Sequence, residues 1–242
     1  MNLVIDQGNA SSKVAVFEDG RLLESFVIKV LTVDGLKAVI DKYPVKNGIL
    51  SSVIQENEPV KEYLESALDQ FFVLSHEMKL PIRVLYKTPN TLGRDRLAAV
   101  VGAHSIKPGH NLLVIDAGTA ITYEFLNAEG CYMGGNISPG MKTRFKALNY
   151  YTQKLPLLNE DGDTPDLGDS TETAIRSGVV NGVVFEIDGY INSLRSKYSD
   201  LFVFLTGGHS FYFERRLKNS IFADINLVLI GLNTILDYNV EK

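Results

Sequence analysis

Short apolar runs bounded by turn residues open the chain. Residues 3–5, 13–17 and 22–30 have the length and apolar content of β-strands. Asp19 and Gly20, between the second and third runs, are a strong hairpin turn signal. Further along, strand-like runs alternate with stretches in which apolar residues recur at helical spacing. This order predicts an α/β layered domain rather than a helical bundle.

The alternation continues through the second half of the chain. A buried strand begins at Leu112 and is followed by a second strand and a hairpin turn at 127–130. The glycines and proline of 134–140 predict a loop. The other elements predicted beyond residue 90 are helices over 94–104, 141–148, 170–196, 211–218 and 226–238, and a strand over 201–205.

The pattern Asp-x-Gly between two strands occurs twice. Three pairs of residues share one offset of 110 positions: Asp6 and Asp116, Gly8 and Gly118, Gly20 and Gly130. Chance recurrence of a short pattern is the alternative, but three anchors in one register favour a duplication. We therefore expect two copies of one domain, 1–108 and 109–242, with the boundary at the linker Pro108-Gly109. Facing copies would place carboxylates on both walls of a cleft.

Composition narrows the classes of protein that remain. The net charge of −5 and pI near 5.4 argue against a nucleic-acid binder, which needs a basic face. The single cysteine, Cys131, cannot form an internal disulfide, which favours a reducing compartment. There is neither a secretory signal pattern nor an apolar run of roughly 20 residues, so we expect a cytoplasmic protein that does not enter a membrane.

The repeated motif suits phosphate chemistry. A glycine turn lets backbone N–H groups approach phosphate oxygens, and a neighbouring carboxylate can hold a cation. The sequence Thr206-Gly207-Gly208, after an apolar strand, adds a third glycine turn. The chain contains neither a P-loop nor a Rossmann fingerprint after a strand.

Six motifs in order resemble one family, the type III pantothenate kinases, within the superfamily of actin, the 70-kDa heat-shock proteins, and sugar and acetate kinases. The matching segments are 6–13, 92–96 with Gly102-Ala103, 116–122, 134–140, 170–175 and 206–208. The resemblance implies an α/β fold of two duplicated ribonuclease H-like (actin-like ATPase) domains with an inter-domain nucleotide cleft. It also implies ATP-dependent phosphorylation of pantothenate to 4′-phosphopantothenate, the first step of coenzyme A synthesis, by a homodimer.

The resemblance assigns residues to ATP and to two cations. The ATP-binding residues it implies are Asp6, Gln7, Gly8, Asn9, Ala10, Ser11, Ser12, Lys13 and Thr119. Asp6 would organise Mg²⁺ or another divalent cation, and Asp116 would hold K⁺ or ammonium. Two positions depart from the family pattern, because Ala10 replaces a hydroxyl residue and Glu124 replaces Asp. Asp6 could instead merely cap a turn, and Lys13 could be an ordinary strand-edge lysine.

The resemblance also assigns a base and a pantothenate site. Asp95 would accept the proton of the attacking hydroxyl, with Arg94 and Arg96 favouring its ionised form. The substrate-binding residues implied are Tyr86, Gly93, Arg94, Asp95, Arg96 and Thr171. Without the family, Asp95 would be read as a charge at a helix start, Tyr86 as a core residue and Thr171 as a helix N-cap.

Two other functions stay open at this point. One is a different small-molecule kinase of the same superfamily, against which the sequence Gly93-Arg94-Asp95-Arg96 argues. The other is a non-catalytic transcriptional accessory protein, which would keep the fold without turnover. The acidic pI and the set Asp6, Asp95 and Asp116 argue against that role.

Overall fold

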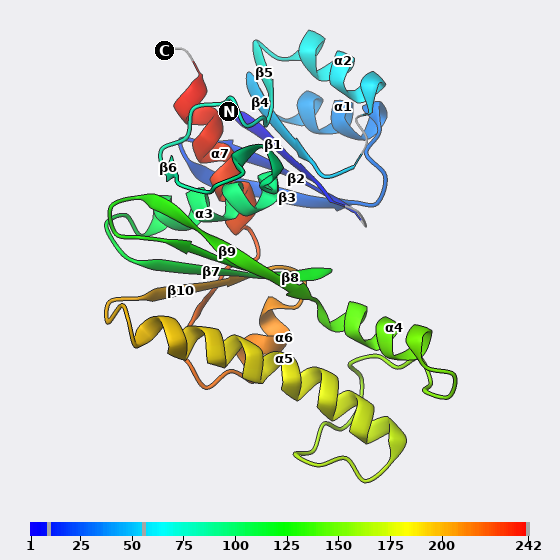
Figure 1. The fold of residues 1–242 in the computed structure, drawn as a ribbon. Coiled ribbons are helices and arrows are strands. Elements are labelled where there is room, and N and C mark those ends of the chain that lie inside the picture. Colours follow the sequence, from blue (N-terminus) through cyan, green and yellow to red (C-terminus); the bar gives the residue numbers. More distant parts are fainter. Residues whose placement is uncertain (9–10, 55–56, 241–242) are drawn as a thin grey trace. The chain divides into compact units, whose positions relative to one another are not determined.

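The computed structural model describes residues 1–8, 11–54 and 57–240, and these fall into two compact units (Figure 1). The first unit comprises 1–109, 126–133 and the described residues from Asn226 onward. The second comprises 110–125 and 134–225. The first change of unit lies within one residue of the predicted boundary, and two later segments return to the first unit.

The first unit is built on one mixed sheet. Its strands are β1 (Asn2–Gln7), β2 (Ser12–Glu18), β3 (Arg21–Ile28), β4 (Asn47–Ser52) and β5 (Gln70–Val73), in the order β3-β2-β1-β4-β5. The central strand β1 pairs antiparallel with β2 and parallel with β4. The predicted meander followed by alternating strands and helices is confirmed.

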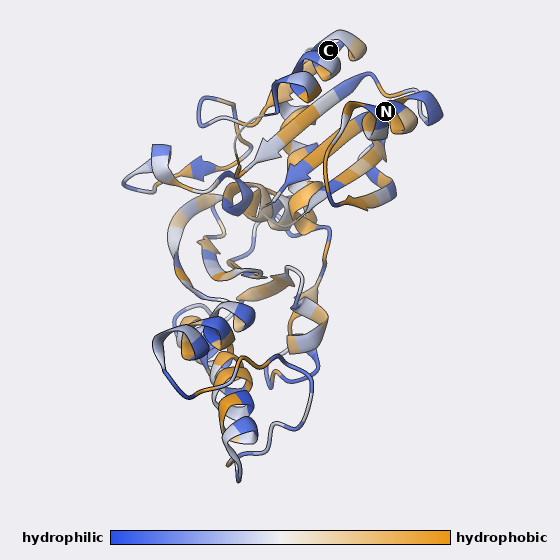
Figure 2. Cartoon of the chain, turned by 90° about the vertical axis from the view of Figure 1, so that its right-hand side faces the viewer, coloured by the Kyte–Doolittle hydropathy of each residue, from blue (hydrophilic) through white to orange (hydrophobic). Residues whose placement is uncertain are grey.

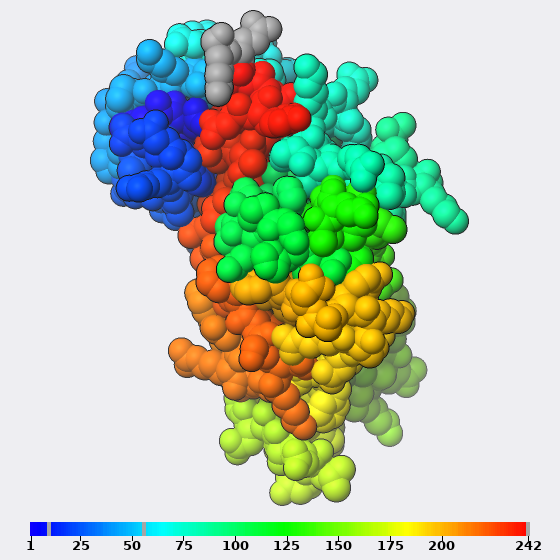
Figure 3. Space-filling view, turned by 90° about the vertical axis from the view of Figure 1, so that its left-hand side faces the viewer, coloured from blue at the N-terminus to red at the C-terminus, as the bar shows by residue number. Residues whose placement is uncertain are grey.

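Helices cover both faces of this sheet (Figure 1). On one face, α1 (Val33–Lys42) and α2 (Glu58–Ala67) bury Leu36 and Leu64 against Leu3 and Ile5 of β1. On the other lies α7 (Leu227–Asn239), and Asn2 Nδ2 of β1 donates a hydrogen bond of 2.9 Å to the Asn233 side chain. Figure 3 shows this red helix against the blue first strands. Successive side chains of β1 point to opposite faces of the sheet, so they pack against two different layers of helices.

Helix α3 (Arg94–Ile106) packs closely against α7 through glycines. A Cβ added at Gly102 would lie 2.2 Å from the Leu227 carbonyl oxygen. One added at Gly231 would lie 1.7 Å from the Ala98 carbonyl oxygen. The two backbones can approach this closely only because neither position carries a side chain. This packing fixes the position of α3, whose first turn carries Asp95.

The second sheet repeats the order of the first. Its strands are β6 (Arg83–Val84), β7 (Leu112–Ala117), β8 (Ala120–Leu126), β9 (Cys131–Pro139), β10 (Phe202–Thr206) and β11 (Phe222–Ala223), in the order β11-β10-β7-β8-β9-β6. Apart from β6, the sequence β9-β8-β7-β10-β11 reproduces β3-β2-β1-β4-β5 position by position. The turn glycines Gly20 and Gly130 have φ of 76° and 73°. The predicted duplication is confirmed in the topology.

Helices α4 (Met141–Tyr151), α5 (Thr171–Arg195) and α6 (Ser210–Glu214) bury apolar side chains against β7, β8 and β10. Ser170 and Thr173 form a reciprocal capping box at the start of α5. Figure 2 shows hydrophobic and hydrophilic positions alternating along the long helix. Within the described residues, no helix has both the length and the hydrophobicity needed to cross a bilayer.

Two local predictions were wrong. Residues 134–140 were expected to form a loop, but β9 runs through to Pro139. A Cβ at Gly135 would lie 2.0 Å from the Tyr123 carbonyl oxygen, so this glycine permits close contact between strands rather than a turn. The helix expected over 211–218 ends at Glu214. The amides of Lys218 and Asn219 donate instead to the Asp188 carboxylate, which holds that segment out of the helix.

Candidate active site

The first predicted phosphate motif lies at the β1–β2 hairpin. Asp6 faces Lys13 across the antiparallel pair and Ser51 across the parallel pair. The amide of Gly8 donates a 3.1 Å hydrogen bond to the Ser11 carbonyl oxygen, which closes the turn. Asn9 and Ala10, both predicted to bind ATP, lie outside the described residues.

Asp6 has unusual electrostatics for a carboxylate. Burial raises its pKa from 3.8 to about 6; nearby Lys13 lowers this pKa and the negative charge of Asp95 raises it. The predicted metal-linked carboxylate and the predicted base therefore lie within electrostatic reach of each other in the first unit. A cation bound at Asp6 would offset the cost of burying its negative charge and the repulsion from Asp95. Asp6 therefore fits the role of a residue that organises a metal ion.

Buried polar atoms without partners occur beside Asp6. Gln7 is 6% exposed and Ser51 is fully buried. Within the described residues, neither Gln7 Oε1 nor Ser51 Oγ has a hydrogen-bond partner. A buried polar atom left unpaired costs about 1–3 kcal/mol. Hydrogen-bonding groups of a ligand or its hydration shell would satisfy these atoms, which agrees with a polar ligand at the ends of β1 and β4.

The predicted substrate motif forms the start of α3. Asp95 lies in the first turn, and its Oδ1 accepts a 2.9 Å hydrogen bond from the Arg96 amide. A Cβ at Gly93 would lie 2.6 Å from this oxygen, so glycine leaves room for the carboxylate. Gly93 and Arg94 line a cavity of about 460 Å³ together with Ser52, the register partner of Gln7. The two motifs thus meet through the end of β4.

Arg96 is held by two tyrosines. Its side chain is buried, and its Nη2 donates a 3.3 Å hydrogen bond to the hydroxyl of Tyr132 on β9. Its guanidinium carbon lies 5.9 Å from the ring centroid of Tyr86. The two tyrosine rings are 6.0 Å apart. Tyr132 was not among the predicted residues, because no local sequence pattern links a strand residue to a helix start so far away in the chain.

The second phosphate motif is the β7–β8 hairpin of the second unit. Asp116 and Thr206 are register partners in neighbouring parallel strands. A Cβ at Gly207 would lie 2.4 Å from Asp116 Oδ1, and one at Gly118 would lie 3.3 Å from it. The His209 amide donates to the Ala117 carbonyl oxygen at 3.1 Å. The carboxylate therefore lies close to the backbones of two glycines, which leave no side chain between it and the turn.

Thr119 is exposed at the tip of the same hairpin. Its carbonyl oxygen accepts hydrogen bonds from the Gly140 amide at 3.0 Å and from Thr143 Oγ1 at 2.8 Å. A Cβ at Gly140 would lie 2.3 Å from the Gly118 carbonyl oxygen. The end of β9 and the start of α4 therefore fix the backbone of this turn.

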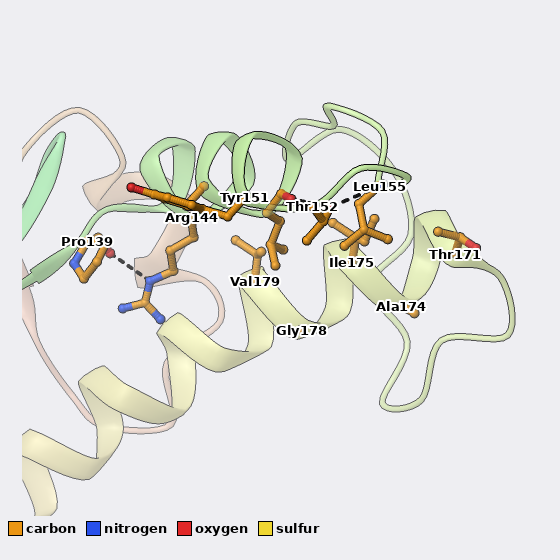
Figure 4. Close-up of a pocket in the computed structure, with 12 residues that line it drawn as sticks. Pro139, Arg144, Tyr151, Thr152, Leu155, Thr171, Ala174, Ile175, Gly178 and Val179 are labelled. Carbon is orange, nitrogen blue, oxygen red and sulfur yellow. Dashed lines mark hydrogen bonds between the residues drawn. The ribbon is translucent and has the colours of Figure 1, made fainter.

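Thr171 is the first residue of α5 and lines a groove between α4 and α5 (Figure 4). The groove has a volume of about 890 Å³. In Figure 4 the apolar side chains Leu155, Ile175 and Val179 lie between the two helices, and Arg144 closes one end by donating to the Pro139 carbonyl oxygen. Most of the lining is aliphatic, so the groove suits an apolar surface better than a charged ligand.

The predicted residues are divided between the two units. The first unit contains Asp6, Gln7, Gly8, Ser11, Ser12, Lys13, Tyr86, Gly93, Arg94, Asp95 and Arg96, and the second contains Asp116, Thr119 and Thr171. Over the described ranges, histidine, cysteine, aspartate and glutamate nowhere gather in threes as a preformed metal cage. A cation that uses one carboxylate and keeps ligand or water oxygens does not require such a cage.

Comparison with known sequences gives one consistent family. The profile of the type III pantothenate kinases matches residues 2–193. A type III pantothenate kinase of Phocaeicola vulgatus is 53% identical over 239 residues, which cover 99% of both chains. One from Bacteroides fragilis is 50% identical over 99% of this chain and 98% of its own. One from Cytophaga hutchinsonii is 45% identical over 99% of this chain and its own full length.

Solved structures agree on the fold. A protein of Campylobacter jejuni described as a conserved putative Baf family transcriptional activator has a TM-score of 0.63 at 23% identity, covering 98% of both chains. The ROK hexokinase of Thermus thermophilus has a TM-score of 0.54 at 13% identity, covering 99% of both. At these identities the similarity establishes the fold and no more. The predicted actin-like ATPase fold is confirmed.

Proposed function

Because the chain belongs to the type III pantothenate kinase family, we propose that it transfers the γ-phosphate of ATP to pantothenate, giving 4′-phosphopantothenate for coenzyme A synthesis. The reaction needs a base beside the acceptor hydroxyl, donors around the phosphates and a divalent cation to balance charge. Membership of this family implies that ATP and pantothenate are the substrates and that a divalent cation is needed.

The observation that carries the proposal is the family match over residues 2–193, and in the first unit we assign the reaction to the buried Asp6 and the nearby Asp95. Asp95 accepts the proton of the pantothenate hydroxyl as that oxygen attacks the γ-phosphorus. Asp6 remains the second negative group and orients the cation's hydration shell. Mg²⁺, when bound, neutralises charge that develops on the phosphate oxygens. The hairpin over 6–13 would supply the hydrogen-bond donors around the phosphates. We expect Asn9 and Ala10 to be among its ATP-binding residues.

The second hairpin would complete ATP binding. Asp116 holds K⁺ or ammonium, and Thr119 contacts the nucleotide. Support for the monovalent site comes from the carboxylate enclosed by Gly118 and Gly207, where a side chain would fill the space.

Pantothenate recognition would centre on Arg96. Its guanidinium can pair with the pantothenate carboxylate in a bidentate arrangement. The Tyr86 ring lies 5.9 Å from the Arg96 guanidinium carbon, and Gly93 and Arg94, just before Arg96 in the chain, line a cavity. We also assign Thr171, at the start of α5, to pantothenate binding.

We further propose a homodimer in the cytoplasm. The apolar groove between α4 and α5 offers a surface for a second copy of the chain. Tyr150, Tyr151 and Phe185 on these helices are 81%, 82% and 66% exposed, which is unusual for large apolar side chains unless another surface covers them. Sedimentation of Phe185→Glu against wild type would test this, since a charge in a buried interface should yield monomers.

The central experiment is a coupled ADP-release assay with ATP, Mg²⁺, K⁺ and pantothenate. ADP release that depends on pantothenate and gives a phosphorylated product supports the proposal. Release with another hydroxyl compound alone would indicate a different small-molecule kinase. Absence of release with every acceptor would favour the non-catalytic role. Replacing K⁺ by Na⁺ should lower the rate if Asp116 holds a size-selected cation, and equal rates in both salts would contradict that assignment.

A further inference from the structure

Glu186 lies at the centre of a polar cluster in the second unit. Its Oε1 accepts hydrogen bonds from the Tyr123 hydroxyl at 2.7 Å and from Ser138 Oγ at 2.5 Å. Its Oε2 forms an ion pair with Arg144 Nη2 at 2.5 Å. Burial acts to raise the pKa of Glu186, but the hydrogen bonds from Ser138, Arg144 and Tyr123 lower it overall. The carboxylate is therefore charged at neutral pH, and both its oxygens are used.

Arg144 extends this cluster along the end of β9. Its Nε donates to the Pro139 carbonyl oxygen at 2.8 Å, and its Nη2 also donates to Ser138 Oγ at 3.2 Å. The planar guanidinium thus joins Glu186 on α5 to two consecutive residues of β9. The side chains of Arg144 and Glu186 are only 22% and 24% exposed, so solvent weakens the pair less than it would on an open surface.

The cluster holds the β7–β8 hairpin from both sides. On one side, Tyr123 of β8 is tied to Glu186, and its ring centroid lies 4.1 Å from that of Tyr190 on α5. On the other, residue Gly140 follows the clamped Pro139 directly, and its amide donates to the Thr119 carbonyl oxygen. The Gly118-Thr119 turn lies between these two attachments.

We propose that Glu186 and Arg144 are positioning residues for the cation and nucleotide hairpin, acting through Tyr123, Ser138 and the Pro139-Gly140 backbone. The inference rests on the proposed roles of Asp116 and Thr119. Neither Glu186 nor Arg144 has to touch a ligand for this. Their contribution is to keep the Thr119 backbone and the neighbouring Asp116 carboxylate in the arrangement that binds the monovalent cation and ATP.

The test compares Glu186→Gln with Asp188→Asn. Asp188 is on the same helix, is a more deeply buried carboxylate and also accepts three hydrogen bonds, but these come from Lys218 and Asn219. We expect Glu186→Gln to raise the K⁺ concentration for half-maximal activity and the KM for ATP by roughly 10-fold, the lower end for residues that orient metal ligands. The KM for pantothenate should stay within about twofold. Asp188→Asn should leave all three constants near wild type.

A second variant and a second measurement keep the inference testable without turnover. Arg144→Lys keeps the charge but loses the planar fork, and should shift the same two constants as Glu186→Gln. Amide hydrogen exchange, followed by mass spectrometry without any ligand, should speed up over 117–123 and 138–141 in both variants, and not in Asp188→Asn.

The outcomes separate this inference from the proposed function. Wild-type protein without pantothenate-dependent turnover would refute the function, while the exchange measurement would still decide whether Glu186 holds the hairpin. Active wild type with equal effects of Glu186→Gln and Asp188→Asn on KM and exchange would overturn the inference, since the role would then be general stability. A change confined to kcat would overturn it as well.

Discussion

The negative charge of Asp95 raises the pKa of Asp6, which burial already raises. One residue lies near the end of a central strand and the other in the first turn of a helix, and the packing of α3 on α7 keeps that turn in place. Two carboxylates in electrostatic contact repel each other unless a proton or a cation intervenes. The proximity of these two carboxylates in one unit therefore supports the proposal that phosphoryl transfer takes place beside them.

Replacing Asp95 by Asn should remove the base and leave nucleotide binding intact. We expect kcat to fall by about 10²–10⁴-fold, the usual contribution of a positioned proton acceptor. The dissociation constant for ATP, measured by calorimetry, should stay close to wild type. Asp34→Asn is the matched control, because Asp34 occupies the first turn of α1 as Asp95 does in α3. If kcat fell equally in both variants, Asp95 would act only as an acidic residue at a helix N-terminus and not as the base.

The raised pKa of Asp6 gives the ligand-free protein a specific pH dependence. Asp6 holds a proton up to about pH 6 when folded and up to about 3.8 when unfolded. Its contribution to stability is therefore complete below pH 4 and is lost as the pH rises through 6. The loss amounts to about 3 kcal/mol, at about 1.4 kcal/mol for each pKa unit.

Urea unfolding of wild type and Asp6→Asn from pH 4 to 8 measures this effect. The variant does not titrate at this position, so its stability relative to wild type should increase with pH. Exposed Glu18→Gln serves as the control and should follow wild type. Parallel stability curves for wild type and Asp6→Asn would contradict the assignment. Mg²⁺ with ATP should recover part of the wild-type stability at pH 8, because only the charged carboxylate favours the cation.

Tyr132 should matter for substrate binding although it is fully buried. Tyr132→Phe removes the hydroxyl that accepts from Arg96 and keeps the ring that packs near Tyr86. We expect the KM for pantothenate to rise several-fold, about 1 kcal/mol for one lost hydrogen bond, with the KM for ATP unchanged. Tyr43→Phe, which loses a hydroxyl contact to Glu24, is the control. A variant that changes both KM values alike would indicate a general packing defect instead.

The α3–α7 contact predicts a large effect from one methyl group. Gly231→Ala would place a carbon within 1.7 Å of the Ala98 carbonyl oxygen, so the helices must separate. We expect a loss of about 3 kcal/mol, the upper range for an overpacked core. Gly189→Ala, in α5 with nothing within 4 Å of the added carbon, should instead stabilise by about 0.5–1 kcal/mol. Thermal unfolding distinguishes the two, and similar effects would mean that the helices adapt easily.

Sequence patterns predicted those parts of the fold whose signals are local. The hairpins at Gly20 and Gly130 carry turn residues that the left-handed backbone requires. The start of the helix at Arg94 follows from the spacing of its apolar residues. The start of α5 was also expected near residue 170, but its N-cap is Ser170 rather than Thr171, and Ser170 forms a capping box with Thr173. The residues proposed for the site came from motif order, and the structure places Asp6 and Asp95 close enough to interact.

Features that depend on contacts between distant segments could not be predicted. Gly135 looks like part of a loop until the neighbouring strand is known to pass against it. Tyr132 and Glu186 carry no motif, and each gains its role only when other strands or helices are placed beside it. The return of α7 to the first unit likewise has no local signal, because an amphipathic helix does not specify which sheet it covers.

That late return has a consequence for how the protein is made. On the ribosome, strands β1 to β5 emerge first, but the helix that covers one face of their sheet is translated only after the whole of the second unit. Domains generally fold as they leave the ribosome, beginning at the N-terminus. Here the second unit can complete its own core first. The sheet of the first unit keeps an apolar face, to which chaperones can bind, until α7 has been synthesised.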